Sequence, residues 1–110
     1  MGETRTSFLG PHEMRRLDLA CVPIRRAFRI NPYLVGSVNT RRDYRDVDVR
    51  LVLPDDHPVH AQGDIHGLNF ALSEYLRLTT DLPIDFQIQT QTEADGYDGA
   101  RNPLGVRWIA

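Results

Sequence analysis

The stretch that decides the fold lies in the middle of the chain and reads Asp46-Val47-Asp48-Val49-Arg50-Leu51-Val52-Leu53. Apolar and polar residues alternate along it, which is the period of a half-buried β-strand. Because successive strand side chains point to opposite faces, the two carboxylates of Asp46 and Asp48 point the same way. Residues 47–53 are therefore predicted to be a strand with one apolar face and one face that begins with two acids.

Two further strand-like runs lie on either side of this stretch. Residues 84–90 alternate in the same manner, with Asp85 on the polar side between Ile84 and Phe86. The short apolar run 33–35 ends at Gly36-Ser37, a turn signal. If strand 84–90 lies beside strand 47–53, Asp85 joins the other two acids on one face of the sheet.

Three carboxylates on one face are costly unless a positive charge lies beside them. Residues two apart on a strand are separated by about 6.5 Å along the chain. At that distance two carboxylates repel by about 2–3 kcal/mol at an effective dielectric near 20. A cation is therefore expected at this face, and oxygen ligands of this kind are those that magnesium prefers.

The remaining pattern predicts one small α+β domain over residues 1–110, with a small mixed sheet and helices packed on one face. Helices are expected over 11–28, with a kink or break at Pro23, and over 67–78. Residues 1–10 are expected to be loose and residues 92–103 to form a loop. The end of the chain, 104–109, is expected to be an edge strand or a docked tail.

Composition sets the outer limits of function. The chain has 110 residues, enough for one core. A formal net charge of −2 gives no indication of nucleic-acid binding. All 13 basic residues are arginine, so no lysine is available as a nucleophile or phosphate ligand. The single cysteine excludes an internal disulfide and, together with the absence of an apolar run of about 20 residues, predicts a cytoplasmic protein with no membrane span.

The order of these elements resembles the minimal nucleotidyltransferase domains of the DNA polymerase beta superfamily. Their signature is a Gly-Ser turn after the first strand, an Asp-x-Asp at the start of the second, and a third Asp on a later strand. Here those positions are Gly36-Ser37, Asp46-Val47-Asp48 and Asp85. The resemblance covers residues 33–90, over half of the chain.

The resemblance implies transfer of a nucleoside monophosphate from a nucleoside triphosphate to a hydroxyl acceptor, with release of pyrophosphate. Magnesium, or manganese in its place, would be held by the acids, with Asp46 and Asp48 binding both ions and Asp85 the catalytic one. Gly36 and Ser37 would bind the terminal phosphates. Arg41 and Arg42 are further candidates for phosphate contact. Domains of this size commonly act with a protein partner or as homo-oligomers, so such a partner is expected here.

Arg50 leaves two other interpretations open. It lies on the same strand face as Asp46 and Asp48, where the family generally has an apolar residue. In the first alternative, its guanidinium replaces the metal, and the protein is a catalytically degenerate nucleotidyltransferase-fold protein with a binding, regulatory or assembly role. In the second, the acids belong to an unrelated α+β protein and are neutralised by neighbouring arginines at a solvent-facing strand.

Overall fold

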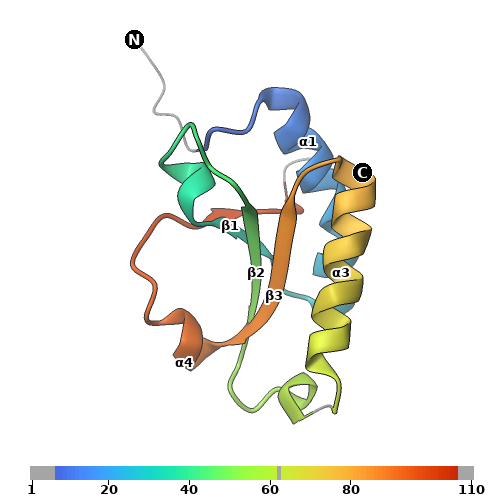
Figure 1. The fold of residues 1–110 in the computed structure, drawn as a ribbon. Coiled ribbons are helices and arrows are strands. Elements are labelled where there is room, and N and C mark those ends of the chain that lie inside the picture. Colours follow the sequence, from blue (N-terminus) through green and yellow to red (C-terminus); the bar gives the residue numbers. More distant parts are fainter. Residues whose placement is uncertain (1–6, 62, 107–110) are drawn as a thin grey trace.

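A computed structural model describes residues 7–61 and 63–106 and shows a four-stranded sheet with helices against it (Figure 1). Its helices and strands are α1 (Pro11–Ala20), α2 (Val22–Phe28), β1 (Tyr33–Val35), β2 (Val47–Leu53), α3 (Ile65–Thr80), β3 (Ile84–Thr90), α4 (Gln91–Ala94) and β4 (Asn102–Pro103). Single turns of 3₁₀ helix lie at Ser37–Asn39 and Pro58–Ala61. The predicted α+β class with a small mixed sheet is confirmed.

The sheet has the strand order β3-β2-β1-β4. Strand β2 pairs antiparallel with β1, where Val35 is opposite Asp48, and parallel with β3, where Asp48 is opposite Asp85. The parallel pair requires a crossover, and α3 supplies it between the two strands. The register thus places the polar positions of β2 and β3 side by side.

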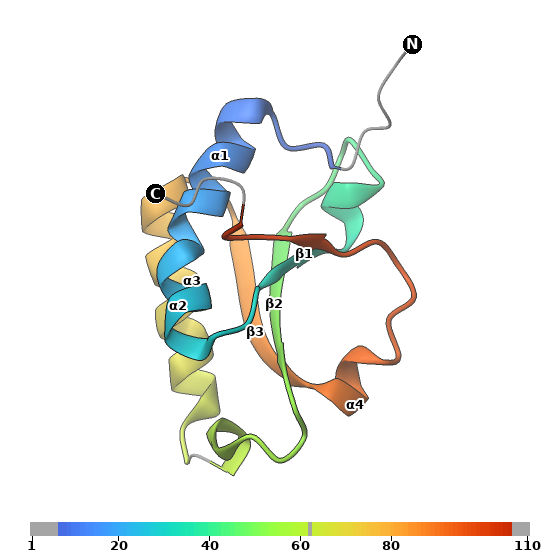
Figure 2. The ribbon, with the colours of Figure 1, turned by 180° about the vertical axis from the view of Figure 1, so that it is seen from behind.

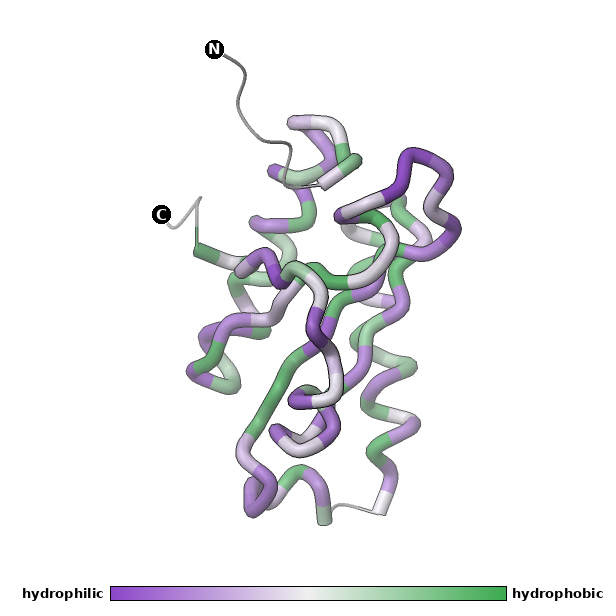
Figure 3. The backbone as a smooth tube through the Cα atoms, turned by 90° about the vertical axis from the view of Figure 1, so that its left-hand side faces the viewer, coloured by the Kyte–Doolittle hydropathy of each residue, from purple (hydrophilic) through white to green (hydrophobic). Residues whose placement is uncertain are grey.

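One face of the sheet is buried beneath α1, α2 and α3, which all lie on the same side in both ribbon views (Figures 1 and 2). Residues of β2 alternate strictly between buried and half-buried, as its sequence pattern predicts. Hydrophobic and hydrophilic positions also alternate along the helices (Figure 3). The core joins the two layers through apolar side chains with at most 3% of their surface exposed, among them Leu17, Ile24, Val49, Leu51, Leu76 and Phe86.

The expected break at Pro23 divides the first helical region into two. Helix α1 ends at Ala20, Cys21 is the cap between the helices, and Pro23 lies in the first turn of α2. Proline has no backbone N–H to donate, so it is tolerated at the start of a helix and not within one. The separation lets Leu17 and Ile24 both reach the core.

The beginning of the described chain is packed rather than loose. The Phe8 amide donates to the Val38 carbonyl at 2.7 Å, and Leu9 is 7% exposed within the core. The prediction of a loose segment over 1–10 therefore does not hold for residues 7–10, because an apolar side chain there completes the core. Residues 1–6 lie outside the described part of the chain.

The segment predicted as a loop over 92–103 contains two short elements. It begins inside α4 and ends in β4, which pairs with β1. Beyond it, Leu104 is fully buried and its amide donates to the Pro32 carbonyl at 2.8 Å, so the chain docks at this point. Residues 107–109, with Trp108, lie outside the described residues.

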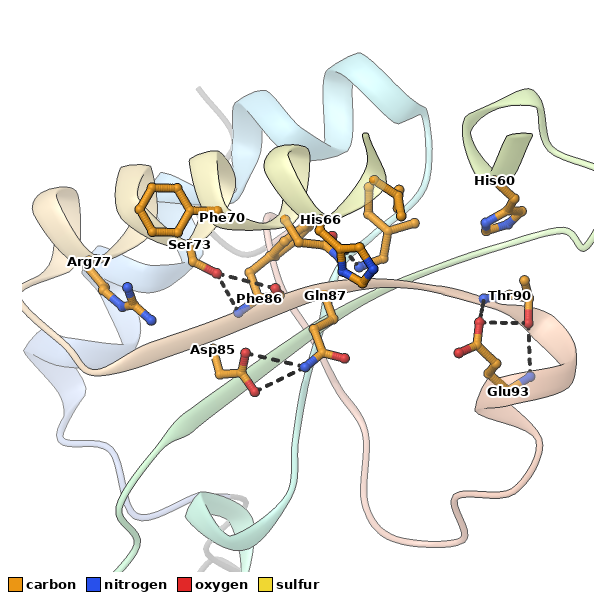
Figure 4. Close-up of a pocket in the computed structure, with 13 residues that line it drawn as sticks. His60, His66, Phe70, Ser73, Arg77, Asp85, Phe86, Gln87, Thr90 and Glu93 are labelled. Carbon is orange, nitrogen blue, oxygen red and sulfur yellow. Dashed lines mark hydrogen bonds between the residues drawn. The ribbon is translucent and has the colours of Figure 1, made fainter. Parts of the chain in front are cut away.

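Three polar side chains of α3, one turn apart, close the outer edge of β3. Two of them, Ser73 and Arg77, are labelled in Figure 4. Ser73 Oγ accepts from the Phe86 amide at 3.0 Å and donates to the Phe86 carbonyl at 3.3 Å. Asn69 accepts from the Ile88 amide at 2.9 Å, and Arg77 donates to the Ile84 carbonyl at 2.8 Å. Since an open strand edge is a template for pairing with another chain, these bonds protect β3.

Candidate functional site

Three sequence motifs that are far apart in the chain meet on the open face of the sheet. Asp48 and Asp85 are directly opposite each other on β2 and β3, and both are on the face turned away from the core. Gly36 follows β1 next to Asp48 and has a φ of 82°. A Cβ at this glycine would collide with the Asp48 carboxylate, so the close approach requires glycine.

The guanidinium of Arg50 lies against the two acids. Its Nη2 is 3.3 Å from Asp85 Oδ2 and 3.8 Å from Asp48 Oδ1. Its Nη1 donates to the backbone carbonyls of Asp85 at 2.7 Å and Val49 at 3.1 Å. The side chain is only 16% exposed. An internal cation therefore lies beside two of the three predicted metal ligands, as the Arg50 alternative requires.

The other predicted site residues are more open to solvent. Asp46 is exposed and precedes β2 by one residue. It lines a polar pocket of about 320 Å³ together with Ser37, Arg41 and Asp48. Arg41 forms an exposed ion pair with Asp43 at 3.0 Å. Arg42 is exposed and is not among the residues that line this pocket.

Arginines offset most of the negative charge of the site. Burial raises the pKa of Asp48, Arg50 opposes the rise, and Asp85 and Asp46 add to it. Arg50 lies close to Asp48 and Asp85, and Arg45 lines the polar pocket together with Asp46 and Asp48. At least two arginines therefore lie near the three carboxylates, and the surplus of negative charge on this face is small.

The donor set suits magnesium by its chemistry, but the acids are not gathered around a common point. Within residues 7–61 and 63–106, no group of three or more His, Cys, Asp or Glu side chains is arranged to hold a metal ion. Asp46 and Asp48 both face the polar pocket, whereas Asp85 is turned to Arg50. Asp46 and Asp48 thus fit a hydrated divalent ion as carboxylate ligands, and Asp85 could join them only if Arg50 moved.

A second pocket, of about 230 Å³, lies on the other side of Asp48. Its wall includes Gly36, Arg50 and Tyr97. The Tyr97 hydroxyl accepts from the Gly36 amide at 3.0 Å and donates to the Ala100 carbonyl at 3.0 Å. No local signal in the sequence identifies the role of Tyr97, because its partner Gly36 is 61 residues away in the chain.

A third pocket, of about 550 Å³, runs along the outer edge of β3 under α3 (Figure 4). Asp85 and Gln87 lie on the side of β3 away from α3, whereas Phe70 and His66 stand over the strand from the helix. Gly36, Asp46 and Asp48 are not among its lining residues. This pocket therefore does not unite the motifs that the sequence singled out.

No protein-family model, no curated protein and no solved structure matches this chain. In the described part of the protein, no helix is long and apolar enough to cross a membrane.

Proposed function

We propose that the protein is a nucleotidyltransferase-like enzyme that moves a nucleoside monophosphate from a nucleoside triphosphate to a hydroxyl acceptor. The observation that carries the proposal is the convergence of Gly36, Asp48 and Asp85 at one place on the open face of the sheet. These residues belong to three motifs that are separate in sequence.

The proposed roles follow from the surroundings of each side chain. Asp46 and Asp48 would bind magnesium or manganese, and Asp85 would act as the third ligand once Arg50 leaves it. Ser37 and Arg41, which line the same polar pocket as Asp46, would contact the triphosphate. Arg42 would reach phosphate only by bending toward that pocket from its exposed position. We place this chemistry in the cytoplasm, where a lone thiol stays reduced.

The contact between Arg50 and Asp85 favours a second candidate from the binding class. In this candidate the guanidinium takes the place of the metal, and the domain keeps its fold for a regulatory or assembly role with a protein partner or a second copy of itself. The backbone carbonyls of Val49 and Asp85 hold Arg50 in position, which makes its departure costly.

Thermal unfolding with ATP, GTP, CTP and UTP, each with and without magnesium or manganese, tests the enzyme. We expect at least one triphosphate to raise the melting temperature only when metal is present. Asp46→Asn should remove this effect, because it removes a proposed metal ligand. The core should stay intact, since Asp46 is exposed. Asp56→Asn, at another exposed acid, is the matched control and should behave as the wild type. An unchanged melting temperature at millimolar nucleotide with metal would contradict the enzyme proposal.

Arg50→Gln separates the two candidates. For an enzyme, the wild type binds Mn²⁺, and the variant binds it more tightly because Asp85 is released. For a degenerate binding protein, the wild type does not bind Mn²⁺, and only the variant does. Calorimetric titration with MnCl₂ measures both, and the circular dichroism spectrum of the variant shows whether the fold is retained.

A further inference from the structure

Residues 91–101 pass over the side of the sheet that the large helices leave open (Figures 1 and 2). We call this stretch the 91–101 segment. It is tied to the turn after β1 at two points: Tyr97 Oη accepts from the Gly36 amide at 3.0 Å, and Asn39 Nδ2 donates to the Ala100 carbonyl at 3.2 Å. Asn39 is itself buried and also donates to the Leu34 carbonyl at 2.9 Å. The 91–101 segment therefore covers this part of the sheet, and these hydrogen bonds hold it to the turn after β1.

The 91–101 segment and the sheet line the pocket of about 230 Å³, which is partly open to solvent. Side chains of β1 and β2 form its apolar floor, namely Tyr33, Val35 and Val52. Three residues of the 91–101 segment face this floor, and three further side chains add polar groups; these are Ala94, Tyr97 and Arg101, then Asp48, Arg50 and Gln89. Apolar and aromatic walls with a few polar groups are typical of small-molecule sites.

Asp48 lines both this pocket and the polar pocket that contains Ser37, Arg41 and Asp46. The two pockets therefore meet at one carboxylate. The walls of the polar pocket are charged and suit a triphosphate and a cation, whereas the walls of the second pocket are mainly apolar. A group-transfer reaction needs two substrates that meet at the reacting atoms, and this division provides a place for each.

We propose that the pocket beneath the 91–101 segment is the subsite for the acceptor, a small molecule with a single flat apolar ring and a hydroxyl directed at Asp48. An apolar cavity of about 150 Å³ holds one benzene molecule, so this pocket has room for one ring and its hydroxyl. Binding of the ring stands independently, whereas its role as an acceptor rests on the proposed function.

The transfer at this subsite would form one bond to phosphorus and break another. The acceptor's hydroxyl oxygen forms a bond to the α-phosphorus of the triphosphate, and the bond from that phosphorus to the oxygen bridging to the β-phosphate breaks. Pyrophosphate leaves with the bonding electron pair. The hydroxyl proton passes to solvent water.

Titration of the ¹⁵N-labelled protein with phenol, without nucleotide or metal, tests the subsite. We expect saturable shifts of the Ala94 and Tyr97 amides, and weaker binding of toluene, which has no hydroxyl. Asp48→Asn should reduce the difference between the two probes. An absence of saturable shifts at these amides would overturn the proposal.

Val52→Phe places a larger side chain in the pocket and should weaken phenol binding by about tenfold or more. Val52→Ala, which keeps the pocket open, is the matched control and should retain binding. Equal affinity in the wild type and Val52→Phe would place phenol elsewhere and contradict the subsite. The outcome is separate from the nucleotide experiment: phenol binding without a metal-dependent triphosphate shift keeps the pocket and removes the enzyme, and the reverse result removes the pocket alone.

Discussion

The candidate site depends on Gly36 having no side chain. Its φ of 82° is a conformation that residues with a Cβ rarely adopt, and the Asp48 carboxylate fills the space where a Cβ would lie. The same residue donates its amide to Tyr97. One glycine thus joins β1, the acidic strand and the 91–101 segment.

Gly36→Ala should lower the free energy of unfolding by about 1–3 kcal/mol, because alanine is strained at this φ and meets Asp48. Urea unfolding followed by circular dichroism measures the loss. Gly63→Ala is the control, since among the described residues no atom outside its chain neighbours lies within 4 Å of the position its Cβ would take. A loss of equal size in both variants would show that the Asp48 contact is unimportant.

Asp48 should make stability depend on pH in the direction opposite to a typical carboxylate. Its pKa is raised in the fold by burial and by Asp85 and Asp46, so the folded protein binds the proton more tightly than the unfolded chain does. Its contribution is then favourable at low pH and is lost as pH rises from the ordinary carboxyl pKa through the raised one. Asp48→Asn should therefore gain stability relative to the wild type across that rise.

Urea unfolding of both proteins between about pH 3 and pH 7 checks this prediction. The difference between the two curves isolates Asp48, because the other acids, including Asp43, Asp55 and Glu93 with their lowered pKa values, are common to both. If the wild type instead became more stable than the variant as pH rises, the effect of Arg50 on the pKa of Asp48 would be larger than that of burial.

At the scale of the elements, α3 and β3 form one unit joined by more than apolar packing. Asn69, Ser73 and Arg77 stand one turn apart on α3 and satisfy the outer backbone groups of β3. The sequence pattern predicted a helix over residues 67–78 but gave no reason for these polar residues. Their hydrogen bonds form only in the tertiary structure, where the edge of β3 lies beside α3.

Ser73→Ala should cost about 1–3 kcal/mol of unfolding free energy, because it leaves the buried amide and carbonyl of Phe86 without a partner. Hydrogen exchange at the Phe86 amide should become faster in the same variant. Thr79→Ala is the control on the same helix, since Thr79 is exposed and bonds only to the Tyr75 carbonyl one turn earlier. Unchanged exchange at Phe86 would contradict the capping role.

At the scale of the whole molecule, one core joins the α1–α3 helices, the sheet and Leu104, which follows β4. Gly105 donates its amide to the buried Asp18 at 2.8 Å and accepts from Arg25 at 2.8 Å. Cys21, fully buried between α1 and α2, lies under this junction. Burial raises the pKa of the Cys21 thiol well above its usual range, and Asp18 adds to the rise.

The Cys21 thiol should therefore be unreactive in the folded protein and become reactive only on unfolding. Labelling with a chromogenic disulfide reagent at increasing urea concentrations measures this, and the rate should rise in parallel with the unfolded fraction. Thr79→Cys adds an exposed thiol and should label promptly in native buffer, as a positive control. Prompt labelling of the wild type would show that the helix layer opens locally.

The strands β1, β2 and β3 were predictable from sequence with the bounds that the structure has. The alternation at 47–53 and 84–90 depends only on the two-residue period of a strand, and Pro23 marks a break wherever it occurs in a helix. Helix α3 extends two residues beyond its predicted ends on each side, to an Asp64 cap and to Asp81 with a φ of 60°. Caps of this kind are weak signals in sequence, so the pattern predicts the helix but not the residues at which it begins and ends.

The sequence by itself determined the periods, the breaks and the presence of acids on the polar face of two strands, since these depend on neighbouring residues in the chain. Only the tertiary structure decided which groups meet. The parallel register sets Asp48 opposite Asp85, the length of Arg50 brings its guanidinium to both, and the return of the 91–101 segment brings Tyr97 to Gly36. The contacts of Asp85 with β2 and of Tyr97 with Gly36 join residues 35 to 61 positions apart, and their geometry depends on how the sheet, α3 and the 91–101 segment pack together.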